Sequence, residues 1–437
     1  FDSDGLMLQL YNAPLNTYPI NFLPGYGFSH ISLKYPRKYK LKGLESYSYL
    51  EEKNSENTNI TWTGYGNGSK SNPLVFDEVN HLFFEPAYDN IDQKFSYTLP
   101  VRAQSGNIFI GDKSSTKLIS VNDIHIVNWP NYSEHINNTD FIIVTDSALL
   151  DGKGTMDEYV NFKQAQFSHP VRLLFDDNLY DAFSYGINHP LAIRHYCKYL
   201  LDNSTTVKPK YLFLLGRGFE PIFNRGLNLR NTVSQQNRNY IPMMGQPASD
   251  NLLVAGLDGP QIEPAISVGR YPADEPEDIE NYLNKQRVYL SNSNQYVDWR
   301  KNVLQLGGGI NSNQSSLISN RLKSLSDLYV KEFPLNGTVY QYSKSAGNAS
   351  DPQIKTNILR LINLSGLNNI TFLGHGSSTT TDIDIGNPDD YVNTGKYPIF
   401  YFNGCQIGNP GKAIDVNSLG FADKIIKGKD KGGIAFI

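Results

Sequence analysis

The stretch NITFLGHGSSTT, residues 369–380, carries an apolar strand up to a histidine, His375, that stands between two glycines. Thirty positions after His375, the stretch IFYFNGC, residues 399–405, carries a second apolar strand up to a glycine and then Cys405. Near-continuous apolar runs are typical of parallel strands that are covered on both faces. The two stretches therefore predict two strands of one parallel sheet, each followed at its carboxyl end by a chemically reactive side chain.

Strands and helices alternate from about residue 136 to the end of the sequence. Asp351 and Pro352 together predict a helix start, because aspartate caps helices and proline fits the first helical position. Further helices are predicted near residues 189–202 and from the segment DEPEDIENYLNKQ, whose first turn is acidic. Eight apolar runs are read as strands, and they are FIIVTD, VRLLF, YLFLLG, AISVGR, VLQLGG, ITFLG, IFYFNG and GIAFI.

This alternation predicts an α/β fold with a doubly wound, mostly parallel sheet. A composition shift at NSNQYVDW divides it into two halves, residues 136–297 and 298–437. The preceding residues 1–135 contain short alternating runs such as FSHISLKY, HLFFEP and FSYTLPV, which predict a β-rich, sandwich-like antiparallel module. Because the sequence begins with Phe1 and ends in a strand-like run, GGIAFI, we expect it to be part of a longer chain that continues at its C-terminus.

Composition excludes several classes of function. The net charge is −4 and no basic tract is present, which argues against nucleic-acid binding. No apolar run approaches the roughly 18 residues of a membrane span. Tyr and Phe are abundant while Cys and Met are scarce, a composition that favours an exported bacterial protein.

Cysteine and histidine at neighbouring strand ends suggest nucleophilic catalysis. A cysteine needs a proton acceptor or a nearby cation to react as a thiolate, and histidine is the natural partner. The flanking glycines permit unusual backbone angles and the close approach of a substrate, and the adjacent N–H groups can stabilise a developing oxyanion. The alternative is a surface histidine and a buried apolar cysteine, but the shared setting favours a pair.

Other candidates are weaker. Cys197 lies on an apolar helical stripe and is expected to be a core residue, so no disulfide with Cys405 is expected. No His or Cys residues stand at the spacing of metal ligands. The segment LGGGINSN, residues 306–313, lacks the lysine of a phosphate-binding loop and is read as a turn.

The motifs FLGHGS and FNGCQIGN resemble those of the gingipain-type (C25-like) cysteine peptidases, which share the caspase-like fold. Further segments are similar in order and spacing, so the resemblance covers about residues 136–437. They are DNLYDAFSYGINHPLAIRHYCKYL, YLFLLGRG, ASDNLLVAGLDG, ISVGRYPADEPEDIENYLNKQRVYL and NSLGFADKIIKGKDKGGIAFI.

The resemblance implies specific roles for the paired motifs. Cys405 is expected to be the nucleophile and His375 the general acid and base. The N–H groups of Gly376 and Cys405 are expected to donate hydrogen bonds to the oxyanion. In this fold the cysteine and histidine often face the scissile bond from two sides, so that a direct hydrogen bond between them is not required.

The acidic third member of such a site is less well defined. Family members often carry an acid in the strand that leads to the Gly-Arg pair, and Ala265 stands at that place here. Asp250 and Glu263 are the candidates, with loop solvation or a salt bridge to Arg270 as the alternative.

Asp382 and Asp384 follow the histidine loop and are expected to line the substrate cleft or to hold a structural cation, although such acids more often face water. No cofactor is expected to be required, and a structural calcium ion is left open.

Within the family, a long chain with a β-rich N-terminal module resembles the sortases of type IX secretion. That resemblance implies a peptidase on the outer face of the bacterial outer membrane, working beside an outer-membrane shuttle barrel. Its substrates would be exported proteins with C-terminal signal domains, and the acyl group would pass to lipopolysaccharide or to water. Two alternatives are a catalytically inactive scaffold that binds a secretion partner and a secreted digestive protease.

Overall fold

The computed structural model describes residues 46–66, 70–115, 130–220, 238–245, 247–260, 262–291, 298–330, 337–344, 351–409 and 419–437. The chain separates into two compact units, residues 1–125 and 126–437. The predicted strand FSHISLKY lies outside the described residues.

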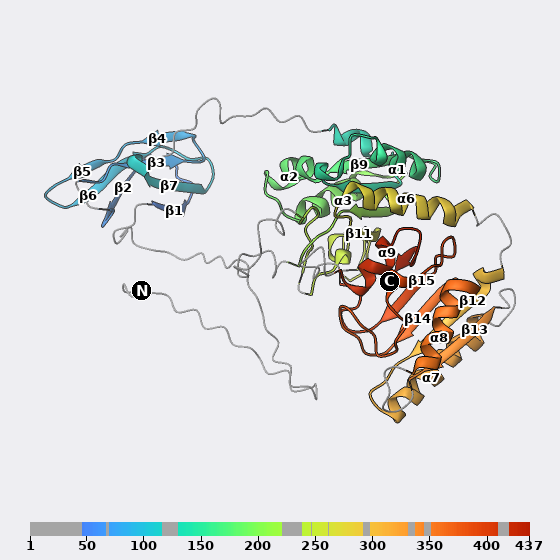
Figure 1. Ribbon diagram of the computed structural model, residues 1–437. Coiled ribbons are helices and arrows are strands. Elements are labelled where there is room, and N and C mark those ends of the chain that lie inside the picture. The colour runs from blue at the N-terminus through green and yellow to red at the C-terminus, as the bar shows by residue number, and fades with distance from the viewer. Residues whose placement is uncertain are drawn as a thin grey trace. The chain divides into compact units, whose positions relative to one another are not determined.

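The first unit is built from two antiparallel sheets (Figure 1), which confirms the predicted β-rich module. One sheet has the strand order β1-β7-β3-β4 and the other β2-β6-β5. The described strands are β1 Ser46–Glu51, β2 Thr58–Thr63, β3 Pro73–Asp77, β4 Leu82–Phe84, β5 Ala87–Asp89, β6 Lys94–Leu99 and β7 Gly106–Asp112.

Both sheets of this unit contribute to one hydrophobic cluster. Val75 and Ile108 come from the first sheet, and Trp62 and Phe95 from the second, and all four are buried. Buried and more exposed residues alternate along β3, as expected for a strand with one face on a core and one toward solvent.

The second unit contains two parallel sheets, which confirms the predicted α/β fold. The first sheet has the order β11-β10-β8-β9, and every pairing in it is parallel. Its strands are β8 Phe141–Thr145, β9 Val171–Phe175, β10 Tyr211–Leu215 and β11 Ser267–Tyr271. Its helices are α1 Thr155–Gln164, α2 Asp176–Ser184, α3 Leu191–Asn203 and α6 Pro276–Ser291.

Helices cover both faces of this sheet, which explains its apolar strands. Ile142 and Val144 of β8 belong to the cluster that includes α2 and α3 residues. Phe141 and Ile143 belong to the cluster that includes α1 and α6 residues. Because successive side chains of a strand point to opposite faces, a strand covered on both faces has no polar side.

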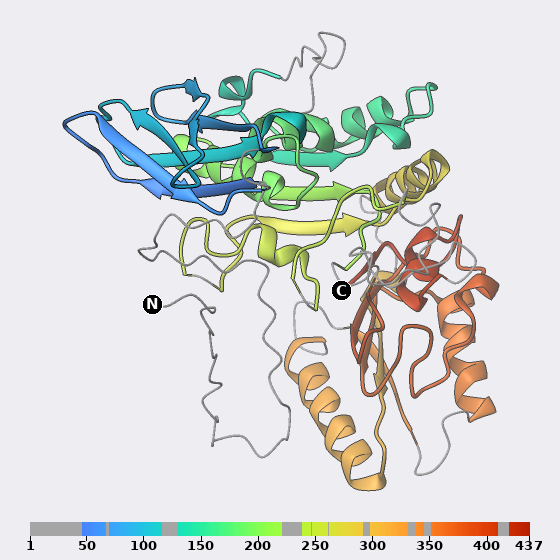
Figure 2. The ribbon, with the colours of Figure 1, turned by 90° about the vertical axis from the view of Figure 1, so that its left-hand side faces the viewer.

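The second sheet has the order β13-β12-β14-β15-β16 and is also entirely parallel. Its strands are β12 Asn302–Gly307, β13 Thr338–Ser343, β14 Asn369–Leu373, β15 Ile399–Asn403 and β16 Ala435–Phe436. Its helices are α7 Ser312–Leu325, α8 Pro352–Arg360 and α9 Phe421–Lys427. Figure 2 shows α7 and α8 on opposite sides of this sheet.

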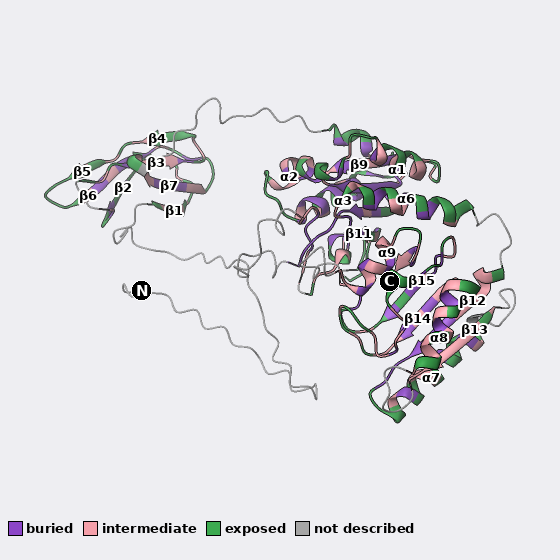
Figure 3. Cartoon of the chain, in the orientation of Figure 1, coloured by how far each residue is buried: buried purple, intermediate pink, exposed green. Residues whose placement is uncertain are grey.

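The eight strands predicted for this unit are present, and β13 was missed. β13 is an edge strand whose residues are half-buried or exposed, so its sequence TVYQYS has no continuous apolar run. Buried residues concentrate on the sheets and exposed residues on the outer helix surfaces (Figure 3).

Helix ends follow the sequence signals. The Asp351 side chain accepts hydrogen bonds from the backbone N–H groups of Gln353 and Ile354, so it caps α8, and Pro352 is the first residue of that helix. In the part of the chain that the structure describes, no helix is long and apolar enough to cross a membrane.

Candidate active site

His375 and Cys405 lie at equivalent positions beyond two neighbouring parallel strands. Leu373, the last residue of β14, is paired with Asn403, the last residue of β15. The ladder continues one step further, because the N–H of Gly374 donates to the carbonyl of Asn403 at 3.2 Å. Adjacent strands run about 4.8 Å apart, so the two reactive residues leave the same edge of the sheet side by side. Both are exposed.

The glycines beside these residues are required by close packing. A Cβ atom built on Gly376 or on Gly404 would lie under 3.0 Å from the side chain of Ile407. Ile407 is buried, so it fills the space beneath both loops and joins them. Neither glycine has a positive φ, so close packing explains the glycines here and a left-handed backbone does not.

The unusual backbone conformation occurs instead at the residue after the cysteine. Gln406 has a φ of 60°, a left-handed conformation that residues other than glycine adopt at a cost. It turns the chain sharply after Cys405. Among the described residues, neither the N–H of Cys405 nor that of Gly376 has a hydrogen-bond acceptor. Two unengaged N–H groups at one sheet edge are what an oxyanion hole requires.

The ring of His375 is held by a residue that the sequence did not single out. Its Nε2 lies 3.2 Å from Oε1 of Gln314, in the first turn of α7. The backbone carbonyl of His375 accepts from the N–H of Asp382 at 2.9 Å. The histidine is therefore fixed by α7 on one side and by its own loop on the other.

Asp382 supports the strand ends from within. Its Oδ2 accepts from the N–H of Gly309 at 2.8 Å, and a Cβ on Gly308 or Gly374 would overlap its carboxylate. Its Oδ1 is buried without a partner among the described residues. This carboxylate is wedged between the ends of β12 and β14, and its role as a cleft residue stays a prediction.

Asp384 is engaged in an ion pair. Its carboxylate contacts Lys355 at 2.9 Å and accepts from the N–H of Gly386. Burial tends to raise the pKa of Asp384, but the bonds to Lys355 and Gly386 outweigh it, so that the pKa is lowered. These contacts give Asp384 a structural role next to the histidine loop.

The two candidates for the third acid have different surroundings. Asp250 makes a bidentate ion pair with Arg270, with both distances 2.8 Å. Arg270 in turn donates to the carbonyls of Gly216 and Ile241. The predicted alternative of a salt bridge to Arg270 is thus the arrangement of Asp250. Glu263 is exposed in the loop before β11.

The first half of the unit also reaches the cysteine loop. Nδ2 of Asn409, four residues after Cys405, donates to Oε1 of Glu220 at 2.6 Å. Glu220 follows β10 and is only 6% exposed. Neither residue was predicted, since nothing in the local sequence links two positions 189 residues apart.

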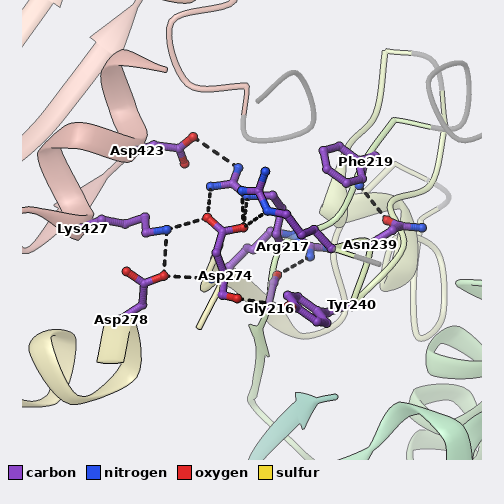
Figure 4. Close-up of polar contacts among 11 residues, drawn as sticks. Gly216, Arg217, Phe219, Asn239, Tyr240, Asp274, Asp278, Asp423 and Lys427 are labelled. Carbon is purple, nitrogen blue, oxygen red and sulfur yellow. Dashed lines mark hydrogen bonds and ion pairs between the residues drawn. The ribbon is translucent and has the colours of Figure 1, made fainter. Parts of the chain in front are cut away.

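A buried cluster of charges joins the two halves near the site (Figure 4). Asp274 accepts two hydrogen bonds from Arg217, at 2.6 and 2.9 Å, and a third from Lys427 at 2.6 Å. Arg217 also contacts Asp423 at 3.2 Å, and Lys427 contacts Asp278 at 2.7 Å. Lys427 and Asp423 belong to α9, whose first N–H binds the carbonyl of Ser378 in the histidine loop.

A pocket of about 540 Å³ opens beside this cluster. Arg238 lines it and donates to Asp274 through Nε at 3.0 Å. Its other lining residues are Asp274, Glu275, Asp278, Asp389, Leu419, Lys424, Lys427 and Gly428. Because both signs of charge are present and several of the charges are paired with one another, the pocket has no evident preference for an anion or a cation.

The second cysteine is an ordinary core residue. Cys197 is fully buried on α3, together with Ile193 and Tyr196. Burial raises the pKa of its thiol to about 12. Both cysteines are free, as predicted. Within the described ranges, no group of three or more His, Cys, Asp or Glu residues is placed to hold a metal ion, and a structural calcium ion stays a prediction.

Two parallel sheets with a cysteine and a histidine at the edge of one of them define a candidate cysteine peptidase. The sequence profile of peptidase family C25 matches residues 135–437, so the chain belongs to that family, the gingipain family of cysteine peptidases. No protein with a curated description matches the sequence.

Solved structures of this family have low sequence identity to the chain. A complex of the pro- and mature domains of RgpB from Porphyromonas gingivalis is 16% identical, with a TM-score of 0.48 over 68% of this chain and 63% of that one. The Arg-specific cysteine proteinase gingipain R is also 16% identical, with a TM-score of 0.48 over 68% of this chain and 62% of that one. Dimeric latent PorU from Porphyromonas gingivalis is 16% identical, with a TM-score of 0.37 over 54% of this chain and 23% of that one. In each case the chain covers less than two thirds of the other chain's length.

Proposed function

We propose that the chain is a cysteine peptidase in which Cys405 is the nucleophile and His375 the general acid and base. The observation that carries this proposal is the register of β14 and β15, which brings the two exposed side chains to one sheet edge. The buried Ile407 beneath both loops supports it, because it fixes the separation of the two strand ends.

The reaction would use each group in turn. The Cys405 thiolate attacks the scissile carbonyl carbon, and the carbonyl oxygen takes the negative charge. The N–H groups of Gly376 and Cys405 donate to that oxyanion. His375 gives its proton to the departing amine, and a thioester on Cys405 remains. Water or an amine then attacks the thioester, and the bond between the acyl carbon and Sγ of Cys405 breaks, which releases the acyl product and regenerates the thiolate. The proton that the attacking group loses returns to His375.

The proposed substrates are exported proteins that carry C-terminal secretion signal domains. In this role the chain is a type IX secretion sortase on the outer face of the outer membrane, next to an outer-membrane shuttle barrel. The acceptor of the acyl group is lipopolysaccharide or water. The support is the antiparallel β unit that precedes a C25 peptidase unit, together with the resemblance of the sequence to the sortases.

Cys405→Ala tests this function. We expect the variant to fold normally, since Cys405 is exposed, and to lose turnover. In cells, exported proteins should then accumulate with their signal domains uncleaved. Normal processing in that variant would contradict the catalytic role.

Two experiments separate the sortase from a digestive protease and from an inactive scaffold: cleavage assays with the purified chain, and processing in cells. Cleavage that requires a C-terminal signal domain supports the sortase, whereas rapid cleavage of free peptides after one residue type supports a digestive protease. Processing that is unaffected by Cys405→Ala but lost when the chain is absent supports an inactive scaffold.

A further inference from the structure

We propose that Gln314 is the positioning residue for His375 and sets the tautomer of its imidazole. This inference rests on the proposed function for its meaning in catalysis, but the tautomer is a property of the chain that can be measured without turnover. It assigns the role that was expected of the third acid to a neutral amide on another element.

The side chain of Gln314 is fixed by the start of α7. Oδ1 of Asn311 accepts from the N–H of Gln314 at 2.9 Å, which caps the helix. Oε1 of Gln314 reaches back and accepts from the N–H of Ile310 at 2.8 Å. These reciprocal bonds form a variant of the capping box, in which the side chain at the third helical position returns to the backbone before the helix.

The bond to Ile310 identifies the atom that faces the histidine. A backbone N–H can only donate, so the amide atom next to it must be the oxygen. The same oxygen lies 3.2 Å from Nε2 of His375. Because a carbonyl oxygen carries no hydrogen, Nε2 must be the donor. The neutral imidazole then has its proton on Nε2, and Nδ1 is the acceptor.

This tautomer suits the proposed reaction. Nδ1 is the ring nitrogen that can receive a proton and later deliver it to the leaving amine. Gln314 is the only hydrogen-bond partner of the His375 ring among the described residues. The candidate acid Asp250 is engaged with Arg270. A neutral oxygen can orient the ring, but it cannot balance the charge of an imidazolium as a carboxylate does.

The first test reads the ring directly. The full chain with Cys405→Ala and ¹⁵N-labelled histidine is studied by long-range ¹H–¹⁵N NMR, and His375→Gln identifies the signal. We expect the Nε2–H tautomer. Gln314→Leu should produce a mixture of tautomers. Gln314→Glu should keep the Nε2–H tautomer, because a carboxylate oxygen at the same place can still accept the hydrogen bond from Nε2. An Nδ1–H tautomer, or an unchanged signal in Gln314→Leu, would overturn the inference.

The second test reads turnover. Gln314→Leu is expected to lower kcat by up to about 100-fold with little change in KM, the order of loss for a misplaced catalytic group. Gln314→Glu should retain most of the kcat of the unsubstituted chain. Asn311→Ala is the matched control, because it removes the other half of the helix cap and leaves Gln314 Oε1 in place. An equal loss of kcat in Asn311→Ala would show that Gln314 acts only through the helix. If neither the unsubstituted chain nor any variant has turnover but the tautomer is as expected, the proposed function fails and this inference stands.

Discussion

Replacing Asp274 with asparagine should destabilise the peptidase unit by about 3–5 kcal/mol, the usual cost of removing one partner of a buried ion pair. The side chain of Asp274 is 10% exposed, and the guanidinium of Arg217 is fully buried. Asparagine can accept one or two of the existing hydrogen bonds but supplies no charge. Arg217 and Lys427 would then lie in a site with one fewer negative charge, and α9 would lose the ion pair between Lys427 and Asp274 that joins it to the first half.

The effect should depend on pH in a defined direction. Burial tends to raise the pKa of Asp274, but the hydrogen bonds and charges of Arg217 and Lys427 outweigh it and lower the pKa well below its usual 3.8. A lowered carboxylate pKa contributes stability above the unfolded value, and this contribution is lost as the pH falls through the folded value. The difference between the two chains should be complete at pH 7 and should shrink below pH 3.8.

Urea unfolding followed by helical circular dichroism measures this difference, because the α-helices of the described residues all lie in the second unit. Glu158→Gln is the matched control. It breaks an exposed ion pair in which the side chain of Glu158 is 60% exposed and that of Arg287 is 45% exposed. Its loss should cost less than about 1 kcal/mol of unfolding free energy. A cost for Asp274→Asn as small as that of the control, or one that does not change between pH 7 and pH 3, would show that the buried ion pairs of Asp274 do not stabilise the unit.

Three further predictions concern the cysteines, the glycines and a buried acid. At pH 7.5 a thiol-directed electrophile should label Cys405 in the native chain and Cys197 only after unfolding. The buried Cys197 thiol has a pKa of about 12, so it is ionised on the order of once in 10⁴ molecules or less. Mass spectrometry of labelled peptides measures the labelling, and equal labelling of both cysteines would contradict the prediction. Gly404→Ala should cost about 1–3 kcal/mol through overpacking against Ile407, and Ile407→Val should recover part of that loss in thermal unfolding; no recovery would mean that the clash lies elsewhere. Burial, and then the charge of Asp146, raise the pKa of Asp176 to about 7, so the stability that its proton provides is complete below about pH 4 and is lost as the pH rises through 7. Asp176→Asn should therefore gain up to about 4 kcal/mol relative to the unsubstituted chain between pH 4 and pH 8, and parallel pH profiles in urea unfolding would count against it.

The sequence predicted the parallel sheets because a strand that is covered on both faces is apolar at nearly every position. β8 and β10 are apolar for this reason. β13 has no such pattern, because an edge strand is only partly covered. The placement of His375 and Cys405 beyond β14 and β15 followed from the same strand pattern.

The surroundings of these residues could not be predicted, because they depend on contacts between distant segments. Gln314 lies 61 positions before His375, and the spacing Asn311 to Gln314 indicates only a helix start. Whether its oxygen also meets an imidazole depends on how α7 packs. Likewise, the segment around Asp274 predicts a helix with an acidic first turn, but the buried pairing of this residue with Arg217 appears only once β10 and β11 lie side by side.

The roles of Cys405 and His375 are best tested by a structure of the chain with a peptidyl ketone bound covalently. We expect a bond from the ketone carbon to Sγ of Cys405, with the former carbonyl oxygen about 2.7–3.1 Å from the N–H groups of Gly376 and Cys405. Nδ1 of His375 should face the leaving-group side, and Nε2 should remain on Gln314. A ketone that binds elsewhere, or an imidazole turned away from the adduct, would contradict these roles.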